Sequence, residues 1–149
     1  MVSFPEPQWF LALGDLMKAE GELFRRTGYA EVRFAIRVLS DDASRTEALT
    51  GVEINGYELS RAVALDDIAG LDPDFVICGP RRVWQRMVDE IAQNGRPELR
   101  HTLNALALLG EHLWLESDDQ LCEDKFYRFN QTLQELFNLA AKLPRRTDA

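Results

Sequence analysis

The sequence predicts an α+β fold in which about five mainly antiparallel strands form a sheet that helices cover on one face. Three strand-like segments follow one another directly between residues 30 and 65, so neighbouring strands are expected to pair antiparallel. A buried strand then runs into a helix within residues 74–84, and an amphipathic helix stands near each end of the chain. The element order expected from these observations is α-β-β-β-β-α-α-β-α.

The first helix is expected over residues 8–27 and has an unusually aromatic apolar stripe. Trp9 and Phe10 begin this stripe, and Gly28 follows the helix as a stop signal. We expect the stripe to cover the core. The open alternative is a contact surface for a homodimer or a protein partner, which exposure of Trp9 and Phe10 in solution would favour.

The first three strands are identified by alternating apolar side chains. Residues 30–38 alternate with a period of two, which is typical of a strand with one face in water. Two further strands, 47–54 and 57–65, meet across Asn55-Gly56, the pair that most easily forms a tight hairpin turn. Together the three segments predict consecutive antiparallel strands.

The fourth strand ends where a helix begins. The apolar residues 75–78 are stopped by Gly79, and Pro80 has the fixed φ that suits the first residue of a helix. Apolar residues then recur at helical spacing from Trp84, so one face of this helix must lie on the sheet. Gly95 is the expected C-cap.

The last part of the chain contains short elements before a closing helix. Pro97 is expected to start a short helix with Leu99, Leu103 and Leu106 on one side, and Gly110 to end it. Residues 113–115 are apolar between charged neighbours, which is enough for one more strand. An amphipathic helix then closes the fold and stops at Pro144.

Length and charge limit the function. A chain of 149 residues with 46% hydrophobic residues can bury one substantial core, so we expect a single domain over 1–149. Its expected parts are a helix at 1–28, a core at 30–142 and a tail at 144–149. The net charge of −8 without a Lys/Arg cluster argues against nucleic-acid binding and against electrostatic attachment to an anionic membrane.

The cysteines and the hydropathy indicate a cytoplasmic protein. Cys78 and Cys122 lie in strand and helix patterns without metal-ligand spacing, so we expect reduced thiols. No export signal stands at residues 1–7. The longest uncharged run, 101–110, is shorter than the ~20 residues that span a bilayer, so no transmembrane segment is expected.

The chain contains a strand that runs straight into a Trp-containing helix (74–84), then a second short helix, a strand near a glycine (110–116) and a terminal amphipathic helix. Together these elements resemble the sterol carrier protein family. The resemblance covers about residues 30–142. It implies a five-stranded sheet, an apolar tunnel between sheet and helices, no catalysis, and fatty acyl chains, sterols or similar lipids as ligands. The segment 96–109 looks longer and more helical than the family's usual connection, and with the ordered first helix it could fill or cap the tunnel.

The predicted function is therefore non-catalytic binding of an apolar ligand, as a carrier or a presenter. Such a site needs only large apolar side chains, since each methylene removed from water gains about 0.8 kcal/mol. The expected lining residues are Phe34, Ile36, Trp84, Met87, Leu106, Trp114, Phe126, Phe129 and Leu133. An ordinary packed core has the same pattern, and that interpretation stays open for each of them.

Catalytic and metal motifs are scarce. Of the two histidines, His101 follows Glu98 and His112 follows Glu111, and neither has a second histidine at metal-ligand spacing. We expect no catalytic residue, no metal and no cofactor. Two alternatives stay open. One is a small α+β enzyme, an isomerase or cyclase with His101 or His112 and a neighbouring carboxylate as acid and base. The other is a protein-interaction domain with a packed core.

Overall fold

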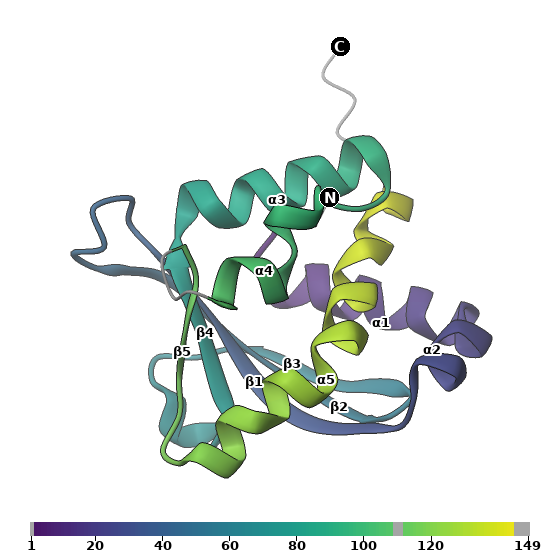
Figure 1. The fold of residues 1–149 in the computed structure, drawn as a ribbon, viewed down its shortest axis with the longest axis horizontal. Coiled ribbons are helices and arrows are strands. Elements are labelled where there is room, and N and C mark those ends of the chain that lie inside the picture. Colours follow the sequence, from purple (N-terminus) through teal and green to yellow (C-terminus); the bar gives the residue numbers. More distant parts are fainter. Residues whose placement is uncertain (1, 109–111, 145–149) are drawn as a thin grey trace.

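The computed structural model describes residues 2–108 and 112–144 (Figure 1). The expected helix end at Gly110 and the expected tail residues 145–149 lie outside the described residues. The helices are α1 (Pro7–Ala19), α2 (Gly21–Thr27), α3 (Arg81–Asn94), α4 (Leu103–Leu108) and α5 (Gln120–Asn138). The strands are β1 (Ala30–Leu39), β2 (Thr46–Gly56), β3 (Glu58–Ala64), β4 (Phe75–Pro80) and β5 (Trp114–Glu116). Three short 3-10 helices are η1 (Ile68–Gly70), η2 (Leu99–His101) and η3 (Leu139–Lys142).

The strands of the described chain form one five-stranded sheet in the order β3-β2-β1-β4-β5. β1 pairs parallel with β4, and the other three pairings are antiparallel. In this register Phe34 lies opposite Val52 on one side and Phe75 on the other. Because paired residues point to the same face, large apolar side chains form rows across the sheet. The expected α+β fold with a mainly antiparallel sheet is confirmed, and the sheet is mixed.

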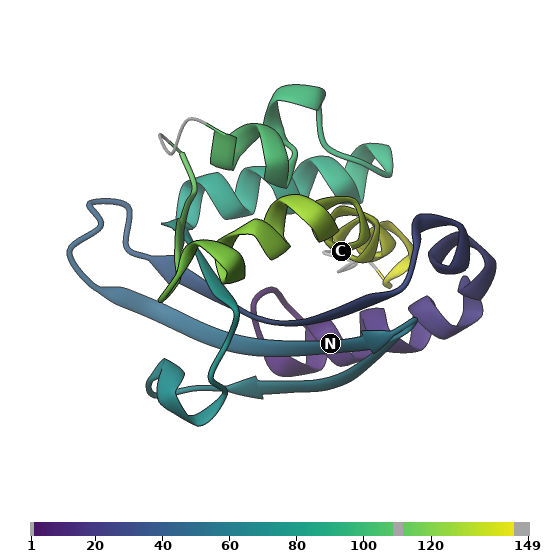
Figure 2. The same ribbon diagram turned by 60° about the horizontal axis from the view of Figure 1, so that its bottom comes forward.

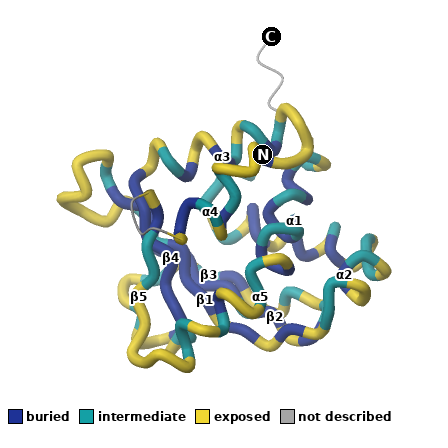
Figure 3. Tube along the Cα trace, in the orientation of Figure 1, coloured by how far each residue is buried: buried dark blue, intermediate teal, exposed yellow. Residues whose placement is uncertain are grey.

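Helices α3, α4 and α5 lie on one side of the sheet (Figure 2). α1 packs mainly against the edge strand β3, where Gly14 allows a close approach, since a Cβ there would lie 3.2 Å from Leu59 Cβ. The buried side chains of these helices and of the strand positions that face them form one cluster. Figure 3 colours the chain by burial and shows buried residues along these helices and strands. Trp9 and Phe10 are 3% and 0% exposed. Trp9 and Phe10 therefore belong to the core, so the exposure that would favour a contact surface is not observed for these two residues.

The first helix is interrupted, which the sequence did not predict. α1 ends at Ala19, Glu20 has the non-helical angles φ −101° and ψ 34°, and α2 begins at Gly21. α2 places Phe24 in the core. Gly28 ends α2 as expected, with a φ of 121° that favours glycine.

The β2–β3 hairpin is confirmed, but its turn is displaced by one residue. Asn55 lies opposite Glu58, so Gly56 and Tyr57 form the turn in place of Asn55 and Gly56. Gly56 has a φ of 70°, and a Cβ there would lie 2.9 Å from Tyr29 Cε2. Glycine at the first turn position supplies a positive φ without Asn55 having to adopt one.

The β4–α3 junction forms as expected, but the helix begins one residue later than expected, at Arg81. Pro80 ends β4 and is the N-cap of α3, with φ −66° and ψ 150°. Gly79 is required by packing, because a Cβ there would lie 2.3 Å from Leu113 Cδ2. Gly95 ends α3 in the left-handed conformation with a φ of 84°, as expected.

The segment after α3 is less helical than expected. Thr102 has extended angles, φ −69° and ψ 158°, and separates η2 from α4. Leu103 and Leu106 are buried on α4, as expected. Leu99 is 88% exposed, so its expected place on an apolar helix side is wrong. Its side chain belongs to a separate 3-10 turn, where the spacing to Leu103 has no helical meaning.

Candidate functional site

Eight of the nine expected lining residues meet in one apolar interior between the sheet and the helices. They come from β1 (Phe34, Ile36), α3 (Trp84, Met87), α4 (Leu106) and α5 (Phe126, Phe129, Leu133). All are buried except Phe129, which is half-buried and packs against the others. This region is called the interior below. The helical stripes and the alternating strand face therefore converge on the same volume.

Aromatic rings fill much of this interior. Phe34 stacks on Phe75 with ring centroids 6.1 Å apart, and Phe126 meets Phe75 edge-on at 5.6 Å. Trp84 stacks on Phe137 at 6.2 Å. The indole Nε1 of Trp84 donates a hydrogen bond to the backbone oxygen of a β1 residue at 3.3 Å, so its polar atom is satisfied. In this conformation the interior is packed by its own side chains.

Trp114 does not join the other eight residues. It pairs with Cys78 in the β4–β5 register, and both lie on the sheet face away from the helices, with Ala35, Leu49 and Val76. The neighbouring Leu115 packs against the interior instead. Trp114 is therefore not part of a lining between sheet and helices.

Burial raises the pKa of the Cys78 thiol to about 12, with a further contribution from Glu116.

A cleft of about 520 Å³ lies between α3 and the η2–α4 segment. It is lined by Arg82, Val83, Arg86, Arg100, His101, Leu106 and His112, and is called the basic cleft below. Leu106 is also part of the interior, and Val83 packs against it. These two apolar side chains thus separate the cleft from the interior. The floor of the cleft is apolar and its walls are basic.

His101 is fixed in the cleft by Glu90. Its Nδ1 lies 3.0 Å and 2.9 Å from the two carboxylate oxygens, and a carboxylate only accepts, so Nδ1 carries the hydrogen. The backbone N–H of Glu98 also donates to Glu90, at 3.0 Å. Desolvation has the largest single effect and raises the pKa of Glu90, but the two hydrogen bonds and the electrostatic contributions of His101 and Arg86 together hold the pKa below its ordinary value. The network joins α3 to η2.

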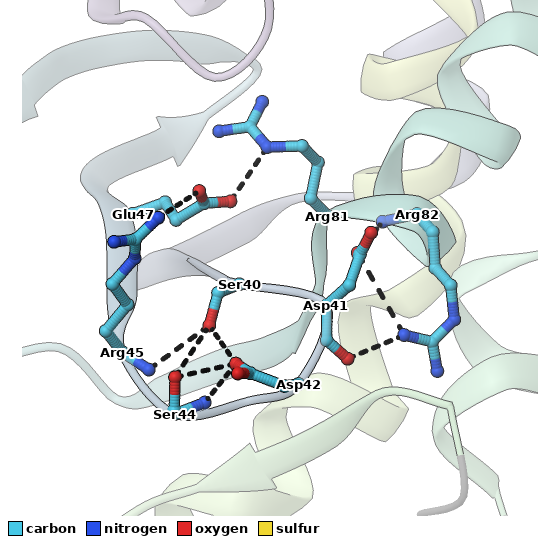
Figure 4. Close-up of polar contacts among 8 residues, drawn as sticks. All are labelled: Ser40, Asp41, Asp42, Ser44, Arg45, Glu47, Arg81 and Arg82. Carbon is cyan, nitrogen blue, oxygen red and sulfur yellow. Dashed lines mark hydrogen bonds and ion pairs between the residues drawn. The ribbon is translucent and has the colours of Figure 1, made fainter.

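Arg82 is held by the loop between β1 and β2 (Figure 4). The Oδ1 atom of Asp41 accepts from the backbone N of Arg82 at 2.9 Å, which satisfies a free N–H group at the start of α3. The Nη1 atom of Arg82 donates to the backbone oxygen of Asp41 at 2.8 Å. In the same loop, hydrogen bonds from Ser44 and Ser40 lower the pKa of Asp42 to about 2. The loop thereby fixes one wall of the cleft.

Sequence reasoning missed the cleft residues Arg82, Arg86 and Arg100 and the role of Glu90. No Lys/Arg cluster is visible in the sequence because the three arginines are spread from residue 82 to residue 100, and the left-handed turn at Gly95 brings them together. The only available signal was an excess of arginine. Residues 81–101 contain five arginines and three carboxylates, in a chain of net charge −8.

The fold was compared with those of known proteins. No protein-family model and no curated protein sequence matches the chain. A solved structure of a conserved hypothetical protein from Thermus thermophilus, a candidate sterol carrier protein, is 21% identical with a TM-score of 0.63, covering 97% of this chain and 94% of that one. Sterol carrier protein 2 is 20% identical with a TM-score of 0.60, covering 92% of this chain and 96% of that one.

The described helices give one further constraint. Within residues 2–108 and 112–144, every helix is too short or too polar to cross a membrane.

The likeness to the two solved structures extends over nearly the whole length of both chains, and it agrees with the element order and mixed sheet described above. The chain therefore has the fold of sterol carrier protein 2.

Proposed function

We propose that this chain binds a ligand with a long apolar part, such as a fatty acyl chain or a sterol, between its sheet and its helices, and that it holds the ligand without catalysis. The observation that carries the proposal is the convergence of eight separately expected side chains on one interior. The fold supports it, since one of the similar structures is a sterol carrier protein.

The energetics of such binding are favourable if the interior can open. Each methylene transferred from water gains about 0.8 kcal/mol, so a chain of about ten methylenes gains roughly 8 kcal/mol before the costs of binding and of opening. Met17 and Met87 are buried thioethers, which adapt to irregular spaces more readily than branched or aromatic side chains. Their presence supports an interior that can repack around a ligand.

The element that would have to move is α4. It has only six residues, and its Leu106 separates the interior from the basic cleft. Its start is held by a hydrogen bond from the backbone N of Leu103 to Gln134 Oε1 at 2.8 Å. Short helices with few such contacts open at a lower free energy than the rest of a fold. Displacement of α4 would therefore join the cleft to the interior.

Native mass spectrometry of the purified protein, followed by organic extraction, tests the proposal. A bound acyl chain, sterol or similar lipid at near-stoichiometric level is the expected result. Phe129→Trp should then reduce occupancy, because the larger ring extends into the interior that Phe129 borders. Tyr127→Trp is the matched control, since Tyr127 lies two residues away on the exposed side of α5.

A protein that carries no lipid and also fails to enhance the fluorescence of an uncharged sterol probe or a fatty-acid probe would overturn the proposal. The interior would then be an ordinary packed core. Equal loss of occupancy in both tryptophan variants would also contradict the assignment, because it would show that the ligand does not distinguish the inner side of α5 from its outer side.

A small enzyme that acts on an apolar substrate is the second candidate, and one contact favours it. With Nδ1–H of His101 held by Glu90, the Nε2 atom is left as a proton acceptor in a histidine that lines the cleft. His101→Gln separates the two functions. A carrier keeps its affinity for an uncharged lipid and returns it unchanged in mass, whereas an enzyme converts the lipid and loses the conversion in this variant.

A further inference from the structure

The basic cleft is placed where the head of an amphipathic ligand would lie. Val83 and Leu106 form its apolar floor and are packed into or against the interior. A chain that entered past Leu106 would leave its terminal group among Arg82, Arg86 and Arg100. The cleft volume of about 520 Å³ accommodates a small polar group with its water.

The side chains of Arg86 and Arg100 are oriented by glutamates but still have N–H groups that can bind a ligand. Arg86 uses Nε toward Glu90 at 3.5 Å, and Arg100 uses Nε toward Glu98 at 2.9 Å. Within residues 2–108 and 112–144, the Nη atoms of Arg86 and Arg100 make no hydrogen bond to the protein. The outer edges of both guanidinium groups are therefore available. Two N–H groups of one guanidinium match the two oxygens of a carboxylate or a phosphate.

The same carboxylates could be considered as a cation site. Glu90, Glu98 and His101 offer ligand atoms that all lie within 4.8 Å of one another. However, Arg86 and Arg100 already lie against the two glutamates, and their fixed positive charges disfavour a metal ion there. The glutamates instead serve to orient the arginines. The charge arrangement favours an anion in the cleft.

We infer that the basic cleft binds the anionic head group, a carboxylate or a phosphate, of the ligand whose apolar part occupies the interior. The inference rests on the proposed function. It narrows the ligand class from apolar molecules in general to amphiphiles with an oxyanion at one end. Arg86 and Arg100 are the residues that contact the head group, and Arg82, which the Asp41 loop positions, forms the third side.

Affinities for a fatty acid, an alkyl phosphate and a fatty alcohol of one chain length test the inference. The unmodified protein should bind the acid and the phosphate more tightly than the alcohol. The double variant Arg86→Gln/Arg100→Gln should weaken binding of the two charged ligands by about 10- to 100-fold, the range expected for loss of charge-assisted hydrogen bonds. Its affinity for the alcohol should not change.

The matched control is Arg61→Gln/Arg96→Gln. Both residues are exposed, neither lines the cleft, and the double variant changes the net charge by the same amount. Equal weakening in both double variants would overturn the inference, because it would reflect overall charge. Thermal unfolding of each variant shows whether the fold is intact, and the alcohol affinity shows whether the interior still binds.

The outcomes separate the two proposals. If the alcohol binds and the charged ligands bind no more tightly, the head-group inference is overturned and the proposed function stands. If none of the three amphiphiles binds, the proposed function fails and the head-group inference fails with it. If inorganic phosphate alone binds the cleft as tightly as the alkyl phosphate, the site takes a free anion, and the link to the interior is overturned.

Discussion

The interior and the basic cleft lie on opposite sides of the same two apolar side chains, Val83 and Leu106, yet different forces maintain them. Phe126 and the other buried residues of the interior are almost completely removed from water, and their contribution comes from apolar burial and packing. In the cleft, Arg86 and Arg100 are 62% and 73% exposed, and ion pairs at such positions stabilise a fold little. The interior therefore determines the fold, while these two arginines can be exchanged at low cost in stability.

The largest effect is expected for Phe126→Ala, which tests the interior directly. The side chain is 0% exposed and meets Phe75 edge-on. Its removal should lower the free energy of unfolding by about 3–5 kcal/mol, the cost of a lost ring and the cavity it leaves. Urea unfolding measures it. The adjacent Tyr127→Ala is the control, because Tyr127 is 40% exposed and its loss should cost less than about 1 kcal/mol. Equal losses of unfolding free energy in the two variants would contradict the distinction between the buried interior and the exposed side of α5.

A smaller effect is expected for Gly79→Ala, at the junction where β4 leads into α3. The added Cβ would lie 2.3 Å from Leu113 Cδ2 and 3.2 Å from the backbone oxygen of His112, so neighbouring atoms must move. We expect a loss of about 1–3 kcal/mol, the usual cost of overpacking. Gly70→Ala is the control, since nothing lies within 4 Å of its Cβ position. The double variant Gly79→Ala/Leu113→Ala should relieve the contact without restoring full stability. A neutral Gly79→Ala would show that this junction has free space.

The interior could be predicted from the sequence because its signals are periodic and local. Alternation placed Phe34 and Ile36 on the helix-facing side of β1, and helical spacing placed Trp84 and Met87 on the inner side of α3. Trp114 shows the limit of this reasoning. A strand of three residues has no measurable period, so its inward side is set by the register with β4, which only the folded sheet reveals.

The break within the first helix and the cleft could not be predicted for different reasons. The apolar stripe continues on both sides of Glu20, so periodicity gives no sign that the backbone leaves the helical region there. The cleft depends on contacts between Glu90 and His101, which are eleven residues apart on two elements joined by an irregular turn. No spacing rule connects such residues, because the path of the chain between them decides their distance.

The smallest effect is expected from the pH dependence of Glu90, which tests the cleft. Because its pKa is lower in the folded protein, ionised Glu90 contributes stability above the ordinary glutamate pKa of about 4.3, and the contribution is lost as the pH falls through the lowered folded value. Glu90→Gln should therefore be less stable than the unmodified protein at neutral pH, by less than about 1 kcal/mol, and the difference should shrink in acid. Urea unfolding at neutral pH and near pH 3 measures it. Glu58→Gln, which removes an exposed carboxylate that forms no ion pair within the described residues, should show no such trend. A difference that stays constant with pH would mean that the role of Glu90 is steric, and that the cleft is not held together by charge.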